Sequence, residues 1–131
     1  MKRTLTAEQQ AARDERRAKF RKLAKQVADM EPEQRSQLAM KMPVVTVEGR
    51  TLSPFNCCLI TSQNPTATVV GGFRQWIASG RAVRKGEHGL CLWVPTGKKA
   101  PEGEPDEVHF LIGTVFDVSQ TDEIETERAA A

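Results

Sequence analysis

The sequence contains few of the residues that build disulfide, metal and catalytic sites. Its 131 residues include three cysteines, two histidines and no tyrosine. Cys57 and Cys58 are adjacent and Cys91 lies far from them, so no disulfide framework is expected. We interpret all three as core residues of a reduced, cytosolic protein. The sequence has no C-x-x-C motif, and His88 and His109 stand alone, so we expect no metal ion and no cofactor.

Catalytic and membrane-spanning patterns are also missing. The sequence shows no paired carboxylates and no nucleophile with a base at a recognisable spacing, so we expect no catalytic residues and no enzyme. Thr96-Gly97-Lys98 is not a nucleotide-binding loop, because the earlier glycine of that motif falls at Leu92. No apolar run is long enough to span a membrane, and no apolar segment follows the basic N-terminus as in a secretory leader.

The net charge of +2 is small, but the charges are segregated along the chain. Residues 1–28 carry nine basic and three acidic residues, residues 71–100 carry six and one, and residues 101–131 carry one and nine. Because a polyanion responds to the local field, this distribution favours nucleic-acid contact at the two basic segments. Aromatic residues make up 5% of the chain, so we expect phosphate contacts to outweigh base stacking.

The second basic segment has the pattern of a phosphate-binding site. Paired glycines lead into a short helix, Phe73–Ser79, which Gly80 ends; a basic turn at residues 81–86 and an apolar strand, Leu90–Val94, follow. Glycines that expose backbone amides beside basic side chains are suited to bind phosphates. The predicted DNA-binding residues here are Gly71, Gly72, Arg74, Arg81, Arg84, Lys85 and Gly86, with Lys98 and Lys99 just beyond the strand.

Two tryptophans lie in the same segment. Phe73, Trp76 and Ile77 have the spacing of one buried helix face, which favours a core position for Trp76. Trp93 lies in the strand, on the face opposite to Leu92. Either tryptophan is a candidate platform for stacking a DNA base, Trp93 being the better placed, and burial is the alternative interpretation for both.

The N-terminal segment predicts a helix of about twenty residues, because Thr6 and Gln9 have the spacing of a capping box. Its second half should dock on the domain through apolar residues at helical spacing: Phe20, Leu23, Ala24 and Val27. A basic ridge that steps by four residues is a secondary DNA-binding candidate: Arg13, Arg17, Arg21 and Lys25. The alternative is a solvated face in which Glu15 pairs with Lys19.

The remaining patterns complete an α+β fold. Pro32 and Pro54 suit the first turns of two further helices, the second of which Ser53 caps. We expect a small, mainly antiparallel sheet packed against helices, with the long basic helix at the N-terminus. The strand patterns fall at Val44–Val47, Val69–Val70, Leu90–Val94 and Val108–Val118.

Several stretches, in this order and spacing, resemble the N-terminal domain of ArdC-type antirestriction proteins, which also occurs in TraC-type plasmid primases. They are Leu52-Ser53-Pro54-Phe55-Asn56 through Leu59-Ile60 and Gln63, Gly72-Phe73-Arg74-Gln75-Trp76, Gly80-Arg81, Val83-Arg84-Lys85-Gly86-Glu87 and Phe116-Asp117-Val118-Ser119-Gln120-Thr121. The resemblance implies a small α+β domain that binds single-stranded DNA without strong sequence preference. Larger members carry a second, metalloprotease-like domain with an H-E-x-x-H motif. This sequence has no such motif, so we do not expect the activities of that domain.

These observations predict three regions: a projecting basic helical arm at residues 1–14, an ArdC N-terminal-like domain at 15–121, and an acidic, disordered tail at 122–131. The resemblance implies a plasmid- or phage-borne antirestriction module that binds incoming single-stranded DNA in the bacterial cytoplasm and protects it from host defence. The alternative is an inhibitor whose acidic segment, residues 101–131, binds a host nuclease or another defence protein. The basic centre weighs against a pure nucleic-acid mimic, because it would cancel the acidic field.

Overall fold

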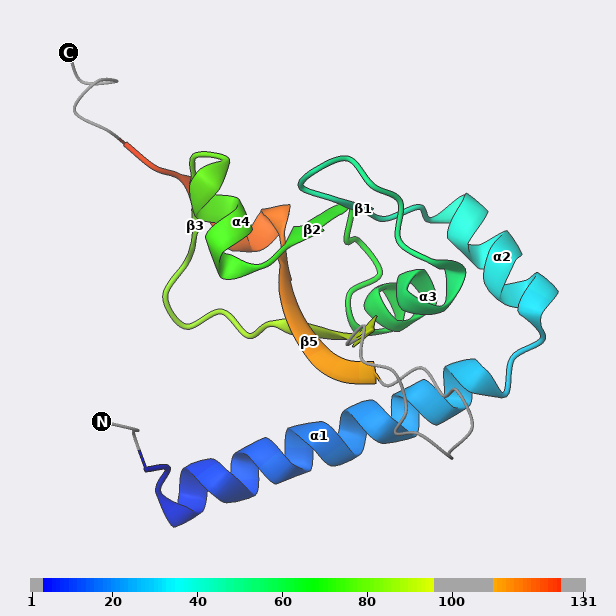
Figure 1. Cartoon of the computed structure of the whole chain (residues 1–131), viewed down its shortest axis with the longest axis horizontal. Coiled ribbons are helices and arrows are strands. Elements are labelled where there is room, and N and C mark those ends of the chain that lie inside the picture. The colour runs from blue at the N-terminus through cyan, green and yellow to red at the C-terminus, as the bar shows by residue number, and fades with distance from the viewer. Residues whose placement is uncertain (1–3, 96–109, 126–131) are drawn as a thin grey trace, which may run out of the picture.

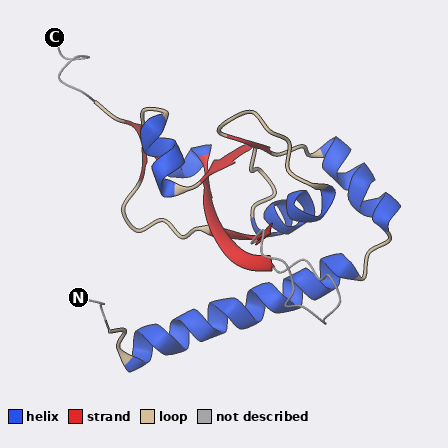
Figure 2. Ribbon diagram, in the orientation of Figure 1, coloured by secondary structure: helices blue, strands red, loops and turns tan. Residues whose placement is uncertain are grey.

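A computed structural model describes residues 4–95 and 110–125, and it confirms the α+β class (Figure 1; Figure 2). The helices are α1 (Ala7–Ala28), α2 (Pro32–Lys41), α3 (Pro54–Gln63), α4 (Phe73–Ala78) and the 3-10 helix η1 (Val118–Gln120). The strands are β1 (Val45–Thr46), β2 (Val69–Gly71), β3 (Arg81–Val83), β4 (Leu90–Pro95), β5 (Phe110–Asp117) and β6 (Thr121–Glu123). Within these residues, no helix combines the length and apolar character that a membrane crossing demands.

The main sheet has the strand order β1-β2-β5-β4 and is mainly antiparallel, as expected. β5 pairs antiparallel with both β2 and β4, whereas β1 pairs parallel with β2. β5 curves strongly along the main sheet, and α1 runs along one side of the domain (Figure 1). A second sheet, β3 with β6, lies beside α4 at the end of the molecule away from α2 (Figure 1).

The sequence patterns did not predict β3 and β6. Residues 81–83 were expected in the basic turn, and residues 122–123 in the acidic tail, but Arg81 pairs with Glu123 and Ala82 with Asp122 across this sheet. Both strands are three residues long, and they lack the apolar alternation that marks a strand in sequence. The chain is therefore ordered in a strand through Glu123.

The long N-terminal helix is confirmed, and so is its cap. Thr6 Oγ1 accepts a hydrogen bond from the Gln9 backbone N–H (3.1 Å), and Gln9 Oε1 accepts one from the Thr6 N–H (3.0 Å). Only the C-terminal half of α1 is buried, through Phe20, Ala24 and Val27. The exposed first half extends beyond this contact alongside the sheet (Figure 1).

Helix α3 lies between two apolar clusters and has five consecutive buried residues, 57–61. Cys57 and Ile60 face a cluster that contains Val44, Val70 and Leu92. The second cluster joins α3 to α1: Cys58, Leu59, Phe20, Ala24 and Val27. Cys57 and Cys58 are therefore core residues, as predicted, and burial raises the pKa of both thiols.

Two side-chain amides of α3 bind the outer backbone edge of β4. Asn56 Nδ2 donates to the Trp93 carbonyl (2.9 Å), and Asn56 Oδ1 accepts from the Trp93 N–H (2.9 Å). Gln63 repeats this arrangement at Cys91, with distances of 2.7 and 2.9 Å. The two amides satisfy an edge that would otherwise be open to another strand, and they fix α3 against the sheet.

Helix α4 buries Trp76 but neither of its apolar neighbours. Trp76 is 3% exposed, as predicted, and its Nε1 donates to the Phe116 carbonyl at 2.9 Å. Phe73 and Ile77 are 54% and 47% exposed, so the prediction of one shared buried face is wrong for them. Successive residues of a helix are rotated by about 100° around its axis. The side chains of Phe73 and Ile77 therefore point about 60° and 100° away from that of Trp76, both to the same side, so a helix that buries Trp76 leaves them at the edge of the buried face.

Candidate nucleic-acid interface

The predicted basic turn is shorter in the structure than in the sequence analysis. The Glu87 N–H donates to the Arg84 carbonyl at 3.2 Å and closes a four-residue turn. Gly86 occupies its third position with φ of +87°, a conformation that residues other than glycine rarely adopt. Lys85 is at the tip and is exposed, whereas Arg81 lies outside this turn, in β3.

Arg81 is engaged within the domain. Its Nε donates to Thr121 Oγ1 (2.7 Å), and its Nη2 donates to the Thr121 carbonyl (3.0 Å). Its Nη1 also lies 3.8 Å from Glu123 Oε1. Only 28% of the Arg81 side chain is exposed, so its main contacts hold β6 against β3.

Arg84 is also engaged within the domain, although 42% of its side chain is exposed. Its guanidinium donates to the backbone carbonyls of Ser119 and Thr121, and it forms salt bridges with Asp122 (3.2 Å) and Glu87 (3.5 Å). Two of the predicted phosphate contacts, Arg81 and Arg84, therefore bind η1 and β6 of the same chain.

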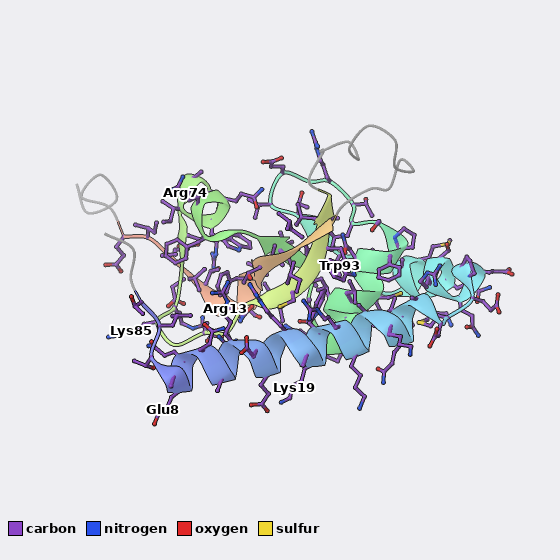
Figure 3. All side chains as sticks on the ribbon, turned by 60° about the horizontal axis from the view of Figure 1, so that its bottom comes forward. Glu8, Arg13, Lys19, Arg74, Lys85 and Trp93 are labelled. Atoms are coloured by element: carbon purple, nitrogen blue, oxygen red, sulfur yellow. The ribbon has the colours of Figure 1, made fainter. Side chains whose placement is uncertain are left out.

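Two of the three predicted glycines have an occupied amide or are buried, whereas Gly86 is exposed in the turn. Gly72 N–H donates to Gln75 Oε1 at 2.8 Å. Gly71 is buried, and a Cβ at this position would lie 2.3 Å from Val47 Cγ2, so close packing accounts for the glycine. Arg74 is exposed on α4 (Figure 3).

The other predicted DNA-binding residues are Trp93, which packs against the core, and Lys98 and Lys99. The Trp93 ring is half-buried and packs edge-on against Phe20, with 5.0 Å between the ring centroids. This contact places Trp93 under α1, which agrees with the alternative interpretation that Trp93 is buried. Lys98 and Lys99 lie outside the described residues.

A groove that the sequence analysis did not identify lies between α1 and the β4–β5 pair. Its volume is about 450 Å³. α1 contributes three arginines to it, β4 and β5 contribute its floor, and the segment after the basic turn forms the other wall. The lining residues are Arg13, Arg16, Arg17, Phe20, Glu87, His88, Gly89, Cys91, Ile112 and Thr114. Figure 3 shows Arg13 between α1 and the sheet, and Lys85 at the end of the molecule where α1 begins.

Helix geometry explains which members of the predicted ridge reach the groove. A step of four residues advances about 40° around a helix, so a ridge spaced by four drifts away from any fixed face. Arg13 and Arg17 point about 20° and 60° to one side of the direction of Phe20 and line the groove. Arg21 and Lys25, at about 100° and 140° on the same side, are exposed and outside its lining. The predicted Glu15–Lys19 pair is also present, at 3.6 Å between exposed groups.

Arg16 is the groove residue that sequence reasoning missed. It lies three residues after Arg13 and four before Phe20, which is the spacing that continues the buried stripe of α1 toward the N-terminus. This spacing is the signal in the sequence that could have identified Arg16 as a groove residue. Among the described residues, none of Arg13, Arg16 and Arg17 forms a salt bridge, so their charges face the groove uncompensated by a direct acidic partner there.

The residues that form the floor of the groove are mostly apolar. Gly89 lies so close to β5 that a Cβ would be 2.1 Å from Thr114 Cγ2. Beside it, Cys91 is half-buried. Burial raises the pKa of the Cys91 thiol, and the positive charge of Arg16 offsets only part of this rise. In the part of the chain that the structure describes, no three His, Cys, Asp or Glu side chains are grouped to hold a metal ion.

The stretch Phe116–Thr121 folds into a hydrogen-bonded support for the wall of the groove. Asp117 is buried; its carboxylate accepts from the Thr68 N–H (2.9 Å) and from the N–H and hydroxyl of Ser119. Burial opposes ionisation of Asp117, but these hydrogen bonds outweigh it and lower the pKa of its carboxyl group. Gln120 Nε2 donates to the His88 carbonyl at 2.7 Å, which connects this support to the groove.

Comparison with known proteins identifies the domain. No curated protein matches the chain. The crystal structure of the antirestriction ArdC protein from the R388 plasmid in its Mn(II)-bound form is similar, with a TM-score of 0.51 and 19% sequence identity. The similarity covers 70% of this chain and 38% of that one. The metal-free structure of the same protein gives a TM-score of 0.48 and 15% identity over 82% of this chain and 41% of that one.

The similarity to the Mn(II)-bound structure supports the fold alone. The chain spans about 38–41% of the length of the protein in these two structures. The family model describes the N-terminal domain of anti-restriction factor ArdC, and it matches residues 9–129, nearly the whole chain. The chain therefore belongs to the family of the N-terminal domain of anti-restriction factor ArdC.

Proposed function

We propose that the chain is a sequence-tolerant, single-stranded-DNA-binding module and that the DNA strand lies in the groove between α1 and β4–β5. The observation that carries this proposal is the set of three arginines, Arg13, Arg16 and Arg17, which line one groove and form no salt bridge among the described residues. Phosphates bind guanidinium groups in bidentate geometry, so adjacent arginines suit successive phosphates of a strand. Lys85 extends the positive surface at the end where α1 begins.

The floor of the groove favours a single strand over a duplex. Cys91 and Ile112, which are half-buried, offer apolar surface beside the arginines. Unpaired bases have faces that can contact such a surface, whereas a duplex hides the faces of its bases in the stack. Neither Trp76 nor Trp93 is an open stacking platform, so charge contacts with the backbone dominate and sequence preference is weak.

Membership of the ArdC N-terminal family supports an antirestriction role. In our proposal the module binds single-stranded DNA of an incoming plasmid or phage in the bacterial cytoplasm and shields it from host defence. It acts by binding and is not an enzyme. Burial raises the pKa of the Cys91 thiol in the groove, which opposes formation of a nucleophilic thiolate there.

The alternative, inhibition of a host defence protein through the acidic segment, receives less support. Asp122 and Glu123 form salt bridges with Arg84 and Arg81 within the chain, so these two acids are already paired. Residues 101–109 and 126–131 lie outside the described residues.

The test is a salt titration of binding to short fluorescent oligonucleotides. Arg13→Ala/Arg16→Ala/Arg17→Ala should weaken binding to every single-stranded sequence alike. It should also reduce the slope of log affinity against log salt by about two units, at about 0.7 per phosphate contact. The matched control, Arg21→Ala/Lys22→Ala/Lys25→Ala, removes the same charge from the same helix outside the groove and should change the slope little. Equal losses in both variants, or equal affinity of the parent for duplex and single strand, would contradict the proposal.

A further inference from the structure

The groove contains one acidic lining residue, Glu87, among the residues that the structure describes. It lies on the wall opposite the arginines of α1 and is the last residue of the Arg84–Glu87 turn. A carboxylate in this position repels the phosphates of a bound strand, because like charges near a surface interact through an effective dielectric constant well below that of water. Compensation of this charge therefore favours the binding of a polyanion in the groove.

Both oxygens of the Glu87 carboxylate have donors in the chain. Glu87 Oε2 lies 3.5 Å from Arg84 Nη2, and Oε1 accepts from Gln120 Nε2 at 3.3 Å. Gln120 is itself fixed, because its Oε1 accepts from the Asp117 N–H at 2.8 Å. The Glu87 side chain is 31% exposed, so these contacts are only partly screened by solvent.

The guanidinium of Arg84 has little capacity left for a ligand. Nη1 donates to Asp122 Oδ1 and to the Thr121 carbonyl, and Nη2 donates to Glu87 Oε2 and to the Ser119 carbonyl. Four of its five N–H donors are therefore directed at acceptors of the same chain. A phosphate contact would have to displace at least one of them.

We propose that Arg84 is a positioning residue for DNA binding: it compensates and orients Glu87 at the wall of the groove and does not contact a phosphate itself. This proposal rests on the proposed function, and it reassigns the role that the sequence pattern gave to Arg84. Arg84 acts through Glu87, whereas Arg13, Arg16 and Arg17 contact the strand.

A double-mutant cycle on the full chain tests the proposal, with a poly-dT oligonucleotide as the probe. Arg84→Ala should weaken binding by about three- to ten-fold, because it leaves the Glu87 charge facing the strand. Adding Glu87→Gln should restore the affinity to within about two-fold of the parent and leave the salt slope unchanged. If the double variant binds as weakly as Arg84→Ala and its slope falls by about 0.7, Arg84 contacts a phosphate and the proposal is wrong.

Two further variants separate the proposal from a loss of structure. Arg81→Ala also removes an arginine that holds β6, but its acidic partner is Glu123, outside the groove lining. It should keep the parent affinity within about two-fold, whereas a loss as large as that of Arg84→Ala would assign both effects to loosening of β6. If a thermal melt shows that Arg84→Ala does not fold, the single variant Glu87→Gln tests the proposal instead. It removes the charge that repels the strand and should therefore tighten binding by about two-fold, whereas an unchanged affinity would contradict the proposal.

The same set of variants also tests the proposed function separately from the role of Arg84. If Arg13→Ala/Arg16→Ala/Arg17→Ala binds poly-dT as well as the parent, the groove assignment fails. If that variant loses binding while Glu87→Gln does not rescue Arg84→Ala, only the role of Arg84 is wrong.

Discussion

Replacing Asn56 by alanine should destabilise the domain strongly, although Asn56 contributes no buried apolar surface to either core cluster. The change removes two hydrogen bonds of 2.9 Å to the backbone of Trp93, one donated and one accepted. A hydrogen bond contributes about 0.5–1.5 kcal/mol net, and leaving a partly buried group without its partner costs more. We therefore expect a loss of about 2–3 kcal/mol in the free energy of unfolding, or about 10 °C in Tm for a domain of this size.

The assay is urea and thermal unfolding of Asn56→Ala beside two controls. Asn56→Asp keeps the side-chain size but places a carboxylate oxygen opposite the Trp93 carbonyl, so it should be at least as destabilising. Ser62→Ala changes an exposed residue of the same helix and should stay within about 0.5 kcal/mol of the parent. A free energy of unfolding for Asn56→Ala within about 0.5 kcal/mol of the parent would refute the argument that this amide holds α3 on β4.

Two further predictions concern stability. Trp76→Ala should cost about 3–5 kcal/mol in unfolding free energy, whereas Ile77→Ser, one residue along and half exposed, should cost less than about 1 kcal/mol; chemical denaturation of both variants checks this contrast. The lowered pKa of Asp117 stabilises the fold above the ordinary pKa of an aspartate, and this contribution is lost as pH falls through the lower folded value. Asp117→Asn should therefore be less stable at pH 7 and show a shallower acid-induced decrease in Tm, and an unchanged pH profile would contradict this assignment.

The elements that local chemistry specifies were predictable from the sequence. The capping box at Thr6, the proline-initiated helices and the strands β2, β4 and β5 each carry a signal within a few residues of chain. The burial of Trp76 also followed from spacing. The same reasoning missed β3 and β6, because two three-residue strands with charged side chains pair through their backbones and salt bridges and show no apolar alternation.

The candidate site was less predictable because it depends on how α1 is rotated against the sheet. The sequence identified α1 as basic, but only the position of Phe20 in the core determines that Arg13, Arg16 and Arg17 face the groove while Arg21 and Lys25 do not. Likewise, the basic run at residues 81–86 has the sequence pattern of a phosphate site, but in the structure its arginines are paired with Thr121, Asp122 and Glu123. Partners some 40 residues away in sequence leave no local signal.

The most direct test of the groove as the DNA site is the rate at which a maleimide labels Cys91. The chain has three cysteines; Cys57 and Cys58 are fully buried, so native-state labelling reports on Cys91 in the floor of the groove. The measurement is made at pH 8.5, since burial raises the thiol pKa, with Cys91→Ser as the blank. A saturating single-stranded oligonucleotide should slow labelling of the parent, and it should not do so at the same concentration for Arg13→Ala/Arg16→Ala/Arg17→Ala. An unchanged labelling rate while anisotropy shows the oligonucleotide bound would place the DNA elsewhere and contradict the account.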